Sequence, residues 1–102
     1  MDVVNIEYKG KKYPVRVSYY ALKMLRAETG KNIEDAEKDM AIYESLLYHS
    51  LVAGANYTGQ ELDLDKEQMV WMLDACFTDF IAALGKFFPA VSDDPKKKTK
   101  AP

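Results

Sequence analysis

The stretch VVNIEYKGKKYPVRVSYYALKMLRAETGKNI, residues Val3 to Ile33, decides the fold because its pattern changes from alternating to helical partway along. Apolar and polar side chains alternate on each side of Lys9-Gly10, which is the two-residue period of half-buried strands. With these two residues as the loop, the facing pairs are Val4 with Val15, Ile6 with Tyr13, Glu7 with Lys12 and Tyr8 with Lys11. A slip of one residue would bury Lys12 and Arg16, so the alternation favours this register.

The residues of this hairpin, over residues 3–17, also indicate how it sits in the fold. Gly10 supplies the positive φ angle that a tight hairpin turn requires. Pro14 has no amide hydrogen, so the second strand is expected at a sheet edge. A lone hairpin is only marginally stable in water, and we therefore expect this one to pack on helices.

The chain after the hairpin has the period of helices, and the expected helices span residues 19–29, 33–37, 39–55 and 66–87. Ser18 is the predicted N-cap of the first helix, and Gly30 is its predicted stop. Gly54, Asn56 and Gly59 are expected to end the helix over 39–55, which we expect to be central because it is apolar around much of its girth.

These elements predict an α+β fold, mainly α with a small β part, in which the N-terminal β-hairpin packs on a bundle of about three to four helices. Residues 1–91 form the expected single globular domain. Residues 92–102 form the expected disordered, lysine-rich tail, because they offer almost nothing apolar to pack. The tail carries a charge of +2, which leaves −4 on the body.

Composition limits the classes of function. The chain has 102 residues, of which 48% are apolar and 29% charged, as in ordinary soluble domains. No apolar run reaches the roughly 20 residues that cross a bilayer, and no signal-peptide pattern opens the chain, so we expect an intracellular protein with no membrane partner. The acidic body and the lack of a nucleic-acid motif argue against a nucleic-acid partner.

The sequence offers few groups for catalysis. His49 is the only histidine and Cys76 the only cysteine, which excludes zinc sites with two or more histidines, an internal disulfide and a thiolate cluster. We interpret Cys76 as a small core residue, and a nucleophile pair with His49 is the weaker alternative. Asp63 and Asp65 are spaced like the start of a calcium loop but lack its glycine and its terminal glutamate. We therefore expect no enzyme, with no catalytic residue, no metal and no cofactor.

The predicted helix over 66–87 has the clearest amphipathic pattern, and Asp65 with Gln68 forms its expected capping pair. Its main apolar stripe consists of Met69, Leu73, Cys76, Phe77, Phe80, Leu84 and Phe87. Three further apolar residues, Val70, Trp71 and Ile81, do not lie on this stripe. We favour the interpretation that a second side of the fold covers them, and the alternative is an apolar patch for another chain.

The end of this helix leaves two interpretations open, because Phe87 and Phe88 precede Pro89. They either staple the helix end to the hairpin or remain available to a partner. The candidate protein-binding residues are Val70, Trp71, Ile81, Phe87 and Phe88.

Several short segments of the chain together suggest a family. They are the alternation around Lys9-Gly10-Lys11, then Ala21-Leu22-Lys23 with Leu25, and then Glu28-Thr29-Gly30-Lys31 with Ile33. In this order they resemble the N-terminal half of the small tail-assembly chaperones of long-tailed bacteriophages. The leucine-rich segment up to Gly54 and the capped segment from Asp65 to Asp74 resemble later parts of that family. The resemblance covers roughly residues 3–84, and the lysine tail departs from it.

The resemblance implies a non-catalytic assembly factor that acts in the host cytoplasm and is absent from the finished virion. Such a chaperone binds the tape-measure protein and recruits tail-tube subunits during tail morphogenesis. Self-association is left open. The alternatives are a structural or homo-oligomeric adaptor subunit retained in an assembly, and a regulatory binder with a single defined partner.

Overall fold

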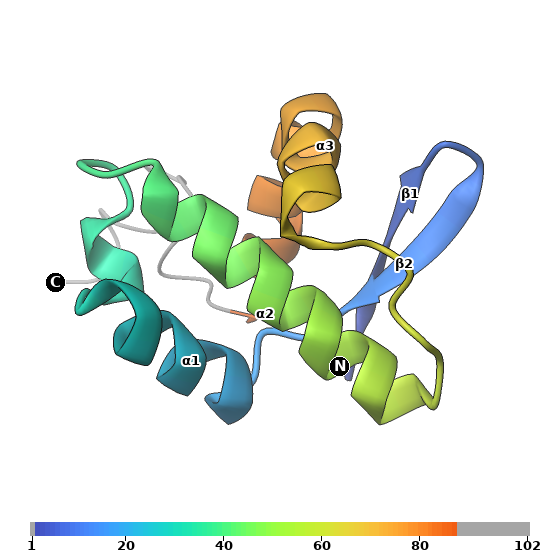
Figure 1. Ribbon diagram of the computed structural model, residues 1–102, viewed down its shortest axis with the longest axis horizontal. Coiled ribbons are helices and arrows are strands. Elements are labelled where there is room, and N and C mark those ends of the chain that lie inside the picture. The colour runs from blue at the N-terminus through green and yellow to red at the C-terminus, as the bar shows by residue number, and fades with distance from the viewer. Residues whose placement is uncertain (1, 88–102) are drawn as a thin grey trace, which may run out of the picture.

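A two-stranded hairpin and three α-helices make up residues 2–87, the part of the chain that the computed structural model describes (Figure 1). In chain order the elements are β1 (Val4–Tyr8), β2 (Lys11–Val15), α1 (Tyr19–Thr29), the short 3-10 helix η1 (Ile33–Asp35), α2 (Ala41–Thr58) and α3 (Lys66–Phe87). The predicted α+β class, with an N-terminal hairpin and a helical body, is confirmed. The predicted tail over 92–102 and the candidate residue Phe88 lie outside the described residues.

The hairpin has the register that the alternation predicts. β1 and β2 are antiparallel, and Ile6 lies opposite Tyr13 while Glu7 lies opposite Lys12. Lys9 and Gly10 both have positive φ angles, 53° and 78°, which is the conformation of a tight primed turn. On the apolar face Ile6, Tyr13 and Val15 are buried, and on the other face Glu7 and Lys12 are exposed, as expected. Pro14 departs from this pattern, because it lies on the second face and is buried.

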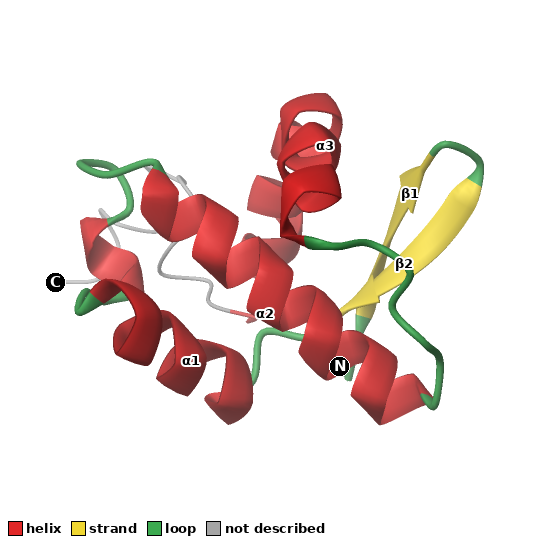
Figure 2. Ribbon diagram, viewed as in Figure 1, coloured by secondary structure: helices red, strands yellow, loops and turns green. Residues whose placement is uncertain are grey.

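Helix α2 is the central element of the fold. It contacts α1, η1, β2 and α3, and Figure 2 shows it crossing the middle of the molecule, with α1 along one side and the hairpin beyond its C-terminal half. Four of its large aliphatic side chains are almost completely buried: Ile42, Leu46, Leu47 and Leu51. Burying each such side chain contributes about 1.5 to 3 kcal/mol, so α2 supplies much of the core.

Of the three residues predicted to end the central helix, Gly59 does so, whereas Gly54 and Asn56 lie inside the helix and the predicted end at residue 55 is wrong. α2 continues to Thr58, and Gly59 ends it in a left-handed conformation with a φ of 76°. Gly54 lies inside the helix because β2 passes directly over it: a Cβ atom at this position would lie 2.5 Å from the carbonyl carbon of Pro14 and closer still to its oxygen. The same crossing is fixed by the Arg16 amide, which donates to the Ser50 carbonyl at 3.0 Å.

The other helix boundaries are close to those predicted. α1 spans residues 19–29 as expected, and Gly30 ends it with a φ of 72°. Ser18 occupies the N-cap position, but its hydroxyl makes no capping hydrogen bond. The predicted turn over 33–37 is shorter, and the helix predicted to start at 39 starts at Ala41, whose amide donates to the Asp39 carboxylate at 3.0 Å.

Helix α3 spans residues 66–87, and its N-terminus has the predicted reciprocal cap. The Gln68 amide donates to the Asp65 carboxylate at 2.8 Å, and the Asp65 amide donates to the Gln68 side chain at 3.0 Å. Met69, Leu73, Cys76, Phe80 and Leu84 of the predicted stripe are buried. The backbone is non-helical at Cys76, with φ −120° and ψ 24°, so α3 is kinked there. The regular spacing of the apolar stripe in the sequence gives no sign of this kink. Within residues 2–87, no helix combines the length and the apolar content that a membrane span requires.

Candidate functional site

The first two turns of α3 expose two of the candidate binding residues. The side chain of Trp71 is 64% exposed and that of Val70 is 41% exposed, although their neighbours Met69 and Met72 are buried. The capping pair before them fixes the start of the helix, so these two side chains stand on a rigid element. We call Val70 and Trp71 the apolar ridge.

The remaining candidates differ from the ridge. Ile81, an off-stripe residue, and Phe87, which belongs to the main stripe, are half-buried and pack against the core. The favoured interpretation, that a second side of the fold covers the off-stripe residues, therefore fits Ile81 and is wrong for the exposed Val70 and Trp71. Phe88 lies outside the described residues. The structure therefore brings Val70 and Trp71 together at one end of α3 and separates them from Ile81 and Phe87 along the same helix.

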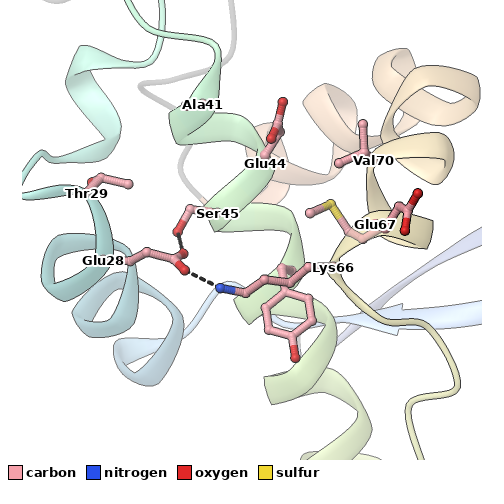
Figure 3. A pocket seen from close by; sticks show the side chains of 10 residues that line it. Glu28, Thr29, Ala41, Glu44, Ser45, Lys66, Glu67 and Val70 are labelled. Atoms are coloured by element: carbon pink, nitrogen blue, oxygen red, sulfur yellow. Dashed lines mark hydrogen bonds and ion pairs between the residues drawn. The ribbon is translucent and has the colours of Figure 1, made fainter.

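A groove lies on the Val70 side of the ridge, with a volume of about 380 Å³ (Figure 3). We call it the acidic groove. Its lining comes from α1, α2 and α3, and consists of Glu28, Thr29, Ala41, Glu44, Ser45, Tyr48, Lys66, Glu67, Met69 and Val70. Three carboxylates and one ammonium group thus line the groove together with the apolar side chains of Ala41, Met69 and Val70.

A second groove, of about 310 Å³, lies on the Trp71 side between α3 and the hairpin. We call it the aromatic groove, because Tyr8, Tyr13 and Trp71 line it together with two lysines. The Tyr8 and Tyr13 rings are 6.4 Å apart, and the Lys11 ammonium lies 5.2 Å from the Tyr13 ring centre. Lys11 also forms an ion pair with Asp63 at 2.7 Å. The apolar ridge therefore separates a groove of acidic character from a groove of aromatic and basic character.

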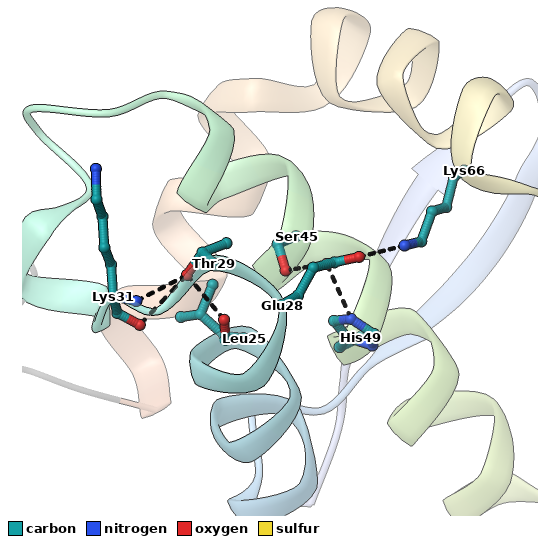
Figure 4. A network of polar contacts seen from close by, with 7 residues as sticks. All are labelled: Leu25, Glu28, Thr29, Lys31, Ser45, His49 and Lys66. Atoms are coloured by element: carbon teal, nitrogen blue, oxygen red, sulfur yellow. Dashed lines mark hydrogen bonds and ion pairs between the residues drawn. The ribbon is translucent and has the colours of Figure 1, made fainter.

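A polar network, three of whose four residues line the acidic groove, joins all three α-helices (Figure 4). The Glu28 carboxylate of α1 accepts hydrogen bonds from the Ser45 hydroxyl at 2.5 Å and from His49 Nε2 at 3.2 Å, both on α2. Its other oxygen pairs with the Lys66 ammonium at the start of α3. These donors, Lys66 first and then Ser45, lower the pKa of Glu28 from its ordinary value of 4.5 to about 2, and the same pairing raises the pKa of Lys66.

This network has the wrong order for nucleophilic catalysis. In a catalytic triad the histidine lies between the nucleophile and the carboxylate, whereas here the carboxylate lies between Ser45 and His49. Glu28, with a pKa of about 2, is also too weak a base to activate a hydroxyl near neutral pH. The network links α1, α2 and α3 and does not have the geometry of a catalytic triad.

Cys76 is the other residue that the sequence offers for nucleophilic chemistry. Cys76 is buried, its thiol donates to the Glu7 carbonyl at 3.4 Å, and burial raises its pKa. No hydrogen bond joins Cys76 to His49 in the part of the chain that the structure describes. Among residues 2–87, no three histidine, cysteine, aspartate or glutamate side chains gather closely enough to hold a metal ion.

Sequence reasoning missed two features of this surface. The first is the Glu28 network, whose only signal in the sequence is the polar pair Ser45 and His49, four residues apart within the most apolar helix. The second is an exposed tyrosine surface around a cavity of about 550 Å³, formed by Tyr19, Tyr20 and Tyr57 together with Arg16, Ser18, Val52, Ala53 and Asn56. The Arg16 guanidinium lies 4.2 Å from the Tyr57 ring centre.

No protein-family model, curated protein or solved structure matches this chain. The resemblance to phage tail-assembly chaperones therefore stays a prediction.

Proposed function

We propose that this protein is a non-catalytic phage tail-assembly chaperone, which binds the tape-measure protein and recruits tail-tube subunits during tail morphogenesis. The observation that carries the proposal is the apolar ridge, in which Trp71 is 64% exposed on a rigid, capped helix between two grooves. Tryptophan is the residue type most enriched at energetically important positions of protein interfaces. An exposed tryptophan on a fixed backbone suits binding better than packing.

The charge and shape of the domain support the same function. A tape-measure protein is long, apolar and rich in helix, so it needs partners that cover apolar stripes without themselves clumping. The chain has a net charge of −2, with the excess of acid on the body, and like charges keep bound copies from collapsing onto each other. Grooves between helices are also the usual seats for amphipathic helices. Under this proposal the protein acts in the host cytoplasm and is absent from the finished virion.

The test of this function is the variant Trp71→Ala in co-expression with the tape-measure protein of the same phage. We expect the soluble fraction of the tape-measure protein to fall sharply, because loss of a central tryptophan costs an interface about 2 kcal/mol, or roughly a thirtyfold loss of affinity. Thermal unfolding of the variant should match that of the parent, since Trp71 contributes little to the core.

Two control variants make this result interpretable. Tyr19→Ala removes an aromatic side chain that is 79% exposed at another place, and it should leave tape-measure solubility unchanged. Met69→Ala removes a buried side chain beside the ridge and should lower the unfolding temperature, because large-to-small core substitutions cost about 2 to 5 kcal/mol. A folded Trp71→Ala protein that keeps the tape-measure protein as soluble as the parent does would contradict the proposed function.

The second candidate function is a structural or homo-oligomeric adaptor subunit that stays in the assembly. The tyrosine surface favours it, because it gives the domain a second exposed aromatic face that lies outside both grooves. The two functions predict different amounts of this protein in purified phage particles. A chaperone should be missing from them, and an adaptor should be present in a fixed ratio to the other subunits.

A further inference from the structure

The charges of the acidic groove are only partly balanced. Glu28 is fully engaged, because one of its oxygens accepts from Ser45 and His49 and the other pairs with Lys66. Lys66 is held in place as well, since its ammonium also lies 5.3 Å from the centre of the Tyr48 ring. The two remaining carboxylates, Glu44 and Glu67, form no ion pair within residues 2–87. The groove therefore presents two unbalanced negative charges.

These two carboxylates stand beside an apolar contact point. Val70 lines the same groove and is exposed, with the buried Met69 below it. In Figure 3 the Val70 side chain lies between those of Glu44 and Glu67, while the ion pair of Glu28 with Lys66 lies next to Ser45. A ligand that fits this arrangement needs an aliphatic group for Val70 and a cationic group on each side of it.

We propose that the acidic groove binds an amphipathic helix in which an aliphatic side chain is flanked by lysine or arginine. A helix meets this requirement because residues three or four apart lie on the same face, so that one aliphatic and two basic side chains can point together into the groove. The charge favours this occupant over an acidic or neutral helix, which would leave both carboxylates unbalanced. Resting on the proposed function, the inference assigns this helix to the tape-measure protein.

The experiment uses a synthetic helical peptide with one leucine face flanked by lysines, and a second peptide in which glutamates replace the lysines. Fluorescence anisotropy measures the binding of each labelled peptide to the full chain. The test variant is Glu44→Lys with Glu67→Lys. Its matched control is Glu34→Lys with Glu61→Lys, which changes the net charge equally at two exposed positions outside the groove.

We expect the parent and the control to bind the basic peptide and to lose it as salt rises, because exposed charge pairs are screened. The test variant should bind the basic peptide at least about tenfold more weakly and should gain affinity for the acidic peptide. That exchange of preference cannot come from unfolding. Circular dichroism should show that both double variants keep their helices.

The outcomes separate this inference from the proposed function. Equal binding of the basic peptide by the test variant and the control would overturn the acidic groove as its site. The groove would also be overturned if the test variant changed the self-association of the chain and left peptide binding unchanged. Tape-measure solubility in co-expression is measured in parallel. If the charge exchange appears but the parent does not solubilise the tape-measure protein, the groove stands and the proposed function falls. If the tape-measure protein is bound equally by all variants, the function stands and the groove falls.

Discussion

Alanine in place of Gly54 is expected to destabilise the fold by about 3 kcal/mol or more, at or beyond the upper end of overpacking effects. In an ordinary helix interior the same change stabilises by roughly 1 kcal/mol, since alanine is the better helix former. The sign reverses here because the added methyl group would meet the backbone of Pro14, at 2.5 Å from its carbonyl carbon. A backbone carbonyl in a paired strand cannot rotate away as a side chain can, so β2 must move off α2.

Urea unfolding followed by circular dichroism measures this effect. Asn56→Ala is the matched control, because it places alanine two residues later in the same helix at an exposed position. The control should be neutral or slightly stabilising. A Gly54→Ala protein as stable as the parent would mean that the hairpin does not cross α2 at this residue.

The second large effect is expected at Glu28. Its replacement by alanine should cost about 2 to 3 kcal/mol near neutral pH, because the Ser45 hydroxyl and the buried His49 Nε2 lose their acceptor and Lys66 loses its counter-charge. Glu34→Ala is the control, as Glu34 is exposed in η1 and forms no ion pair among the described residues. It should change stability by about 0.5 kcal/mol or less.

The pH dependence of stability gives Glu28 an independent signature. Its pKa falls from 4.5 to about 2 on folding, so the unfolded chain binds the proton more readily and the contribution of Glu28 is present above pH 4.5. That contribution is lost as the pH falls from 4.5 towards 2. The full shift corresponds to about 3 kcal/mol, and the 35% exposure of the side chain reduces this to about 1 to 2 kcal/mol.

Thermal unfolding of the parent and of Glu28→Ala should therefore converge as the pH drops through this window. The Glu34→Ala control should instead stay close to the parent at every pH. A difference between parent and Glu28→Ala that is the same at pH 2 and at pH 7 would show that the carboxylate charge contributes nothing to stability.

The hairpin was the most predictable part of the fold, because its information is local. A two-residue period and one glycine determine the pairing of Ile6 with Tyr13 without reference to the rest of the chain. The end of α2 was mispredicted for the opposite reason. A local rule interprets a glycine near a helix end as a stop. Gly54 is instead required by the close approach of Pro14, which lies 40 residues earlier in the sequence.

The candidate site shows the same contrast between features that depend on local sequence and features that depend on tertiary packing. Val70 and Trp71 could be selected from the sequence because departure from an apolar stripe is visible in a helical period. The Glu28 network could not, since its four side chains come from three helices whose packing no single segment encodes. The two grooves likewise depend on how α3 sits against α2 and the hairpin.

The packing of β1 against α3 also means that the first described strand cannot be fully covered before the last described helix is present. Among the described elements β1 is synthesised first and α3 last, yet the two are in contact, and the Cys76 thiol donates to the Glu7 carbonyl 69 residues earlier in the sequence. While only the residues up to the end of α2 have emerged, the apolar side of the first strand lacks its cover. Because these contacts need both ends of the described region, the domain can complete its core only after α3 has been synthesised.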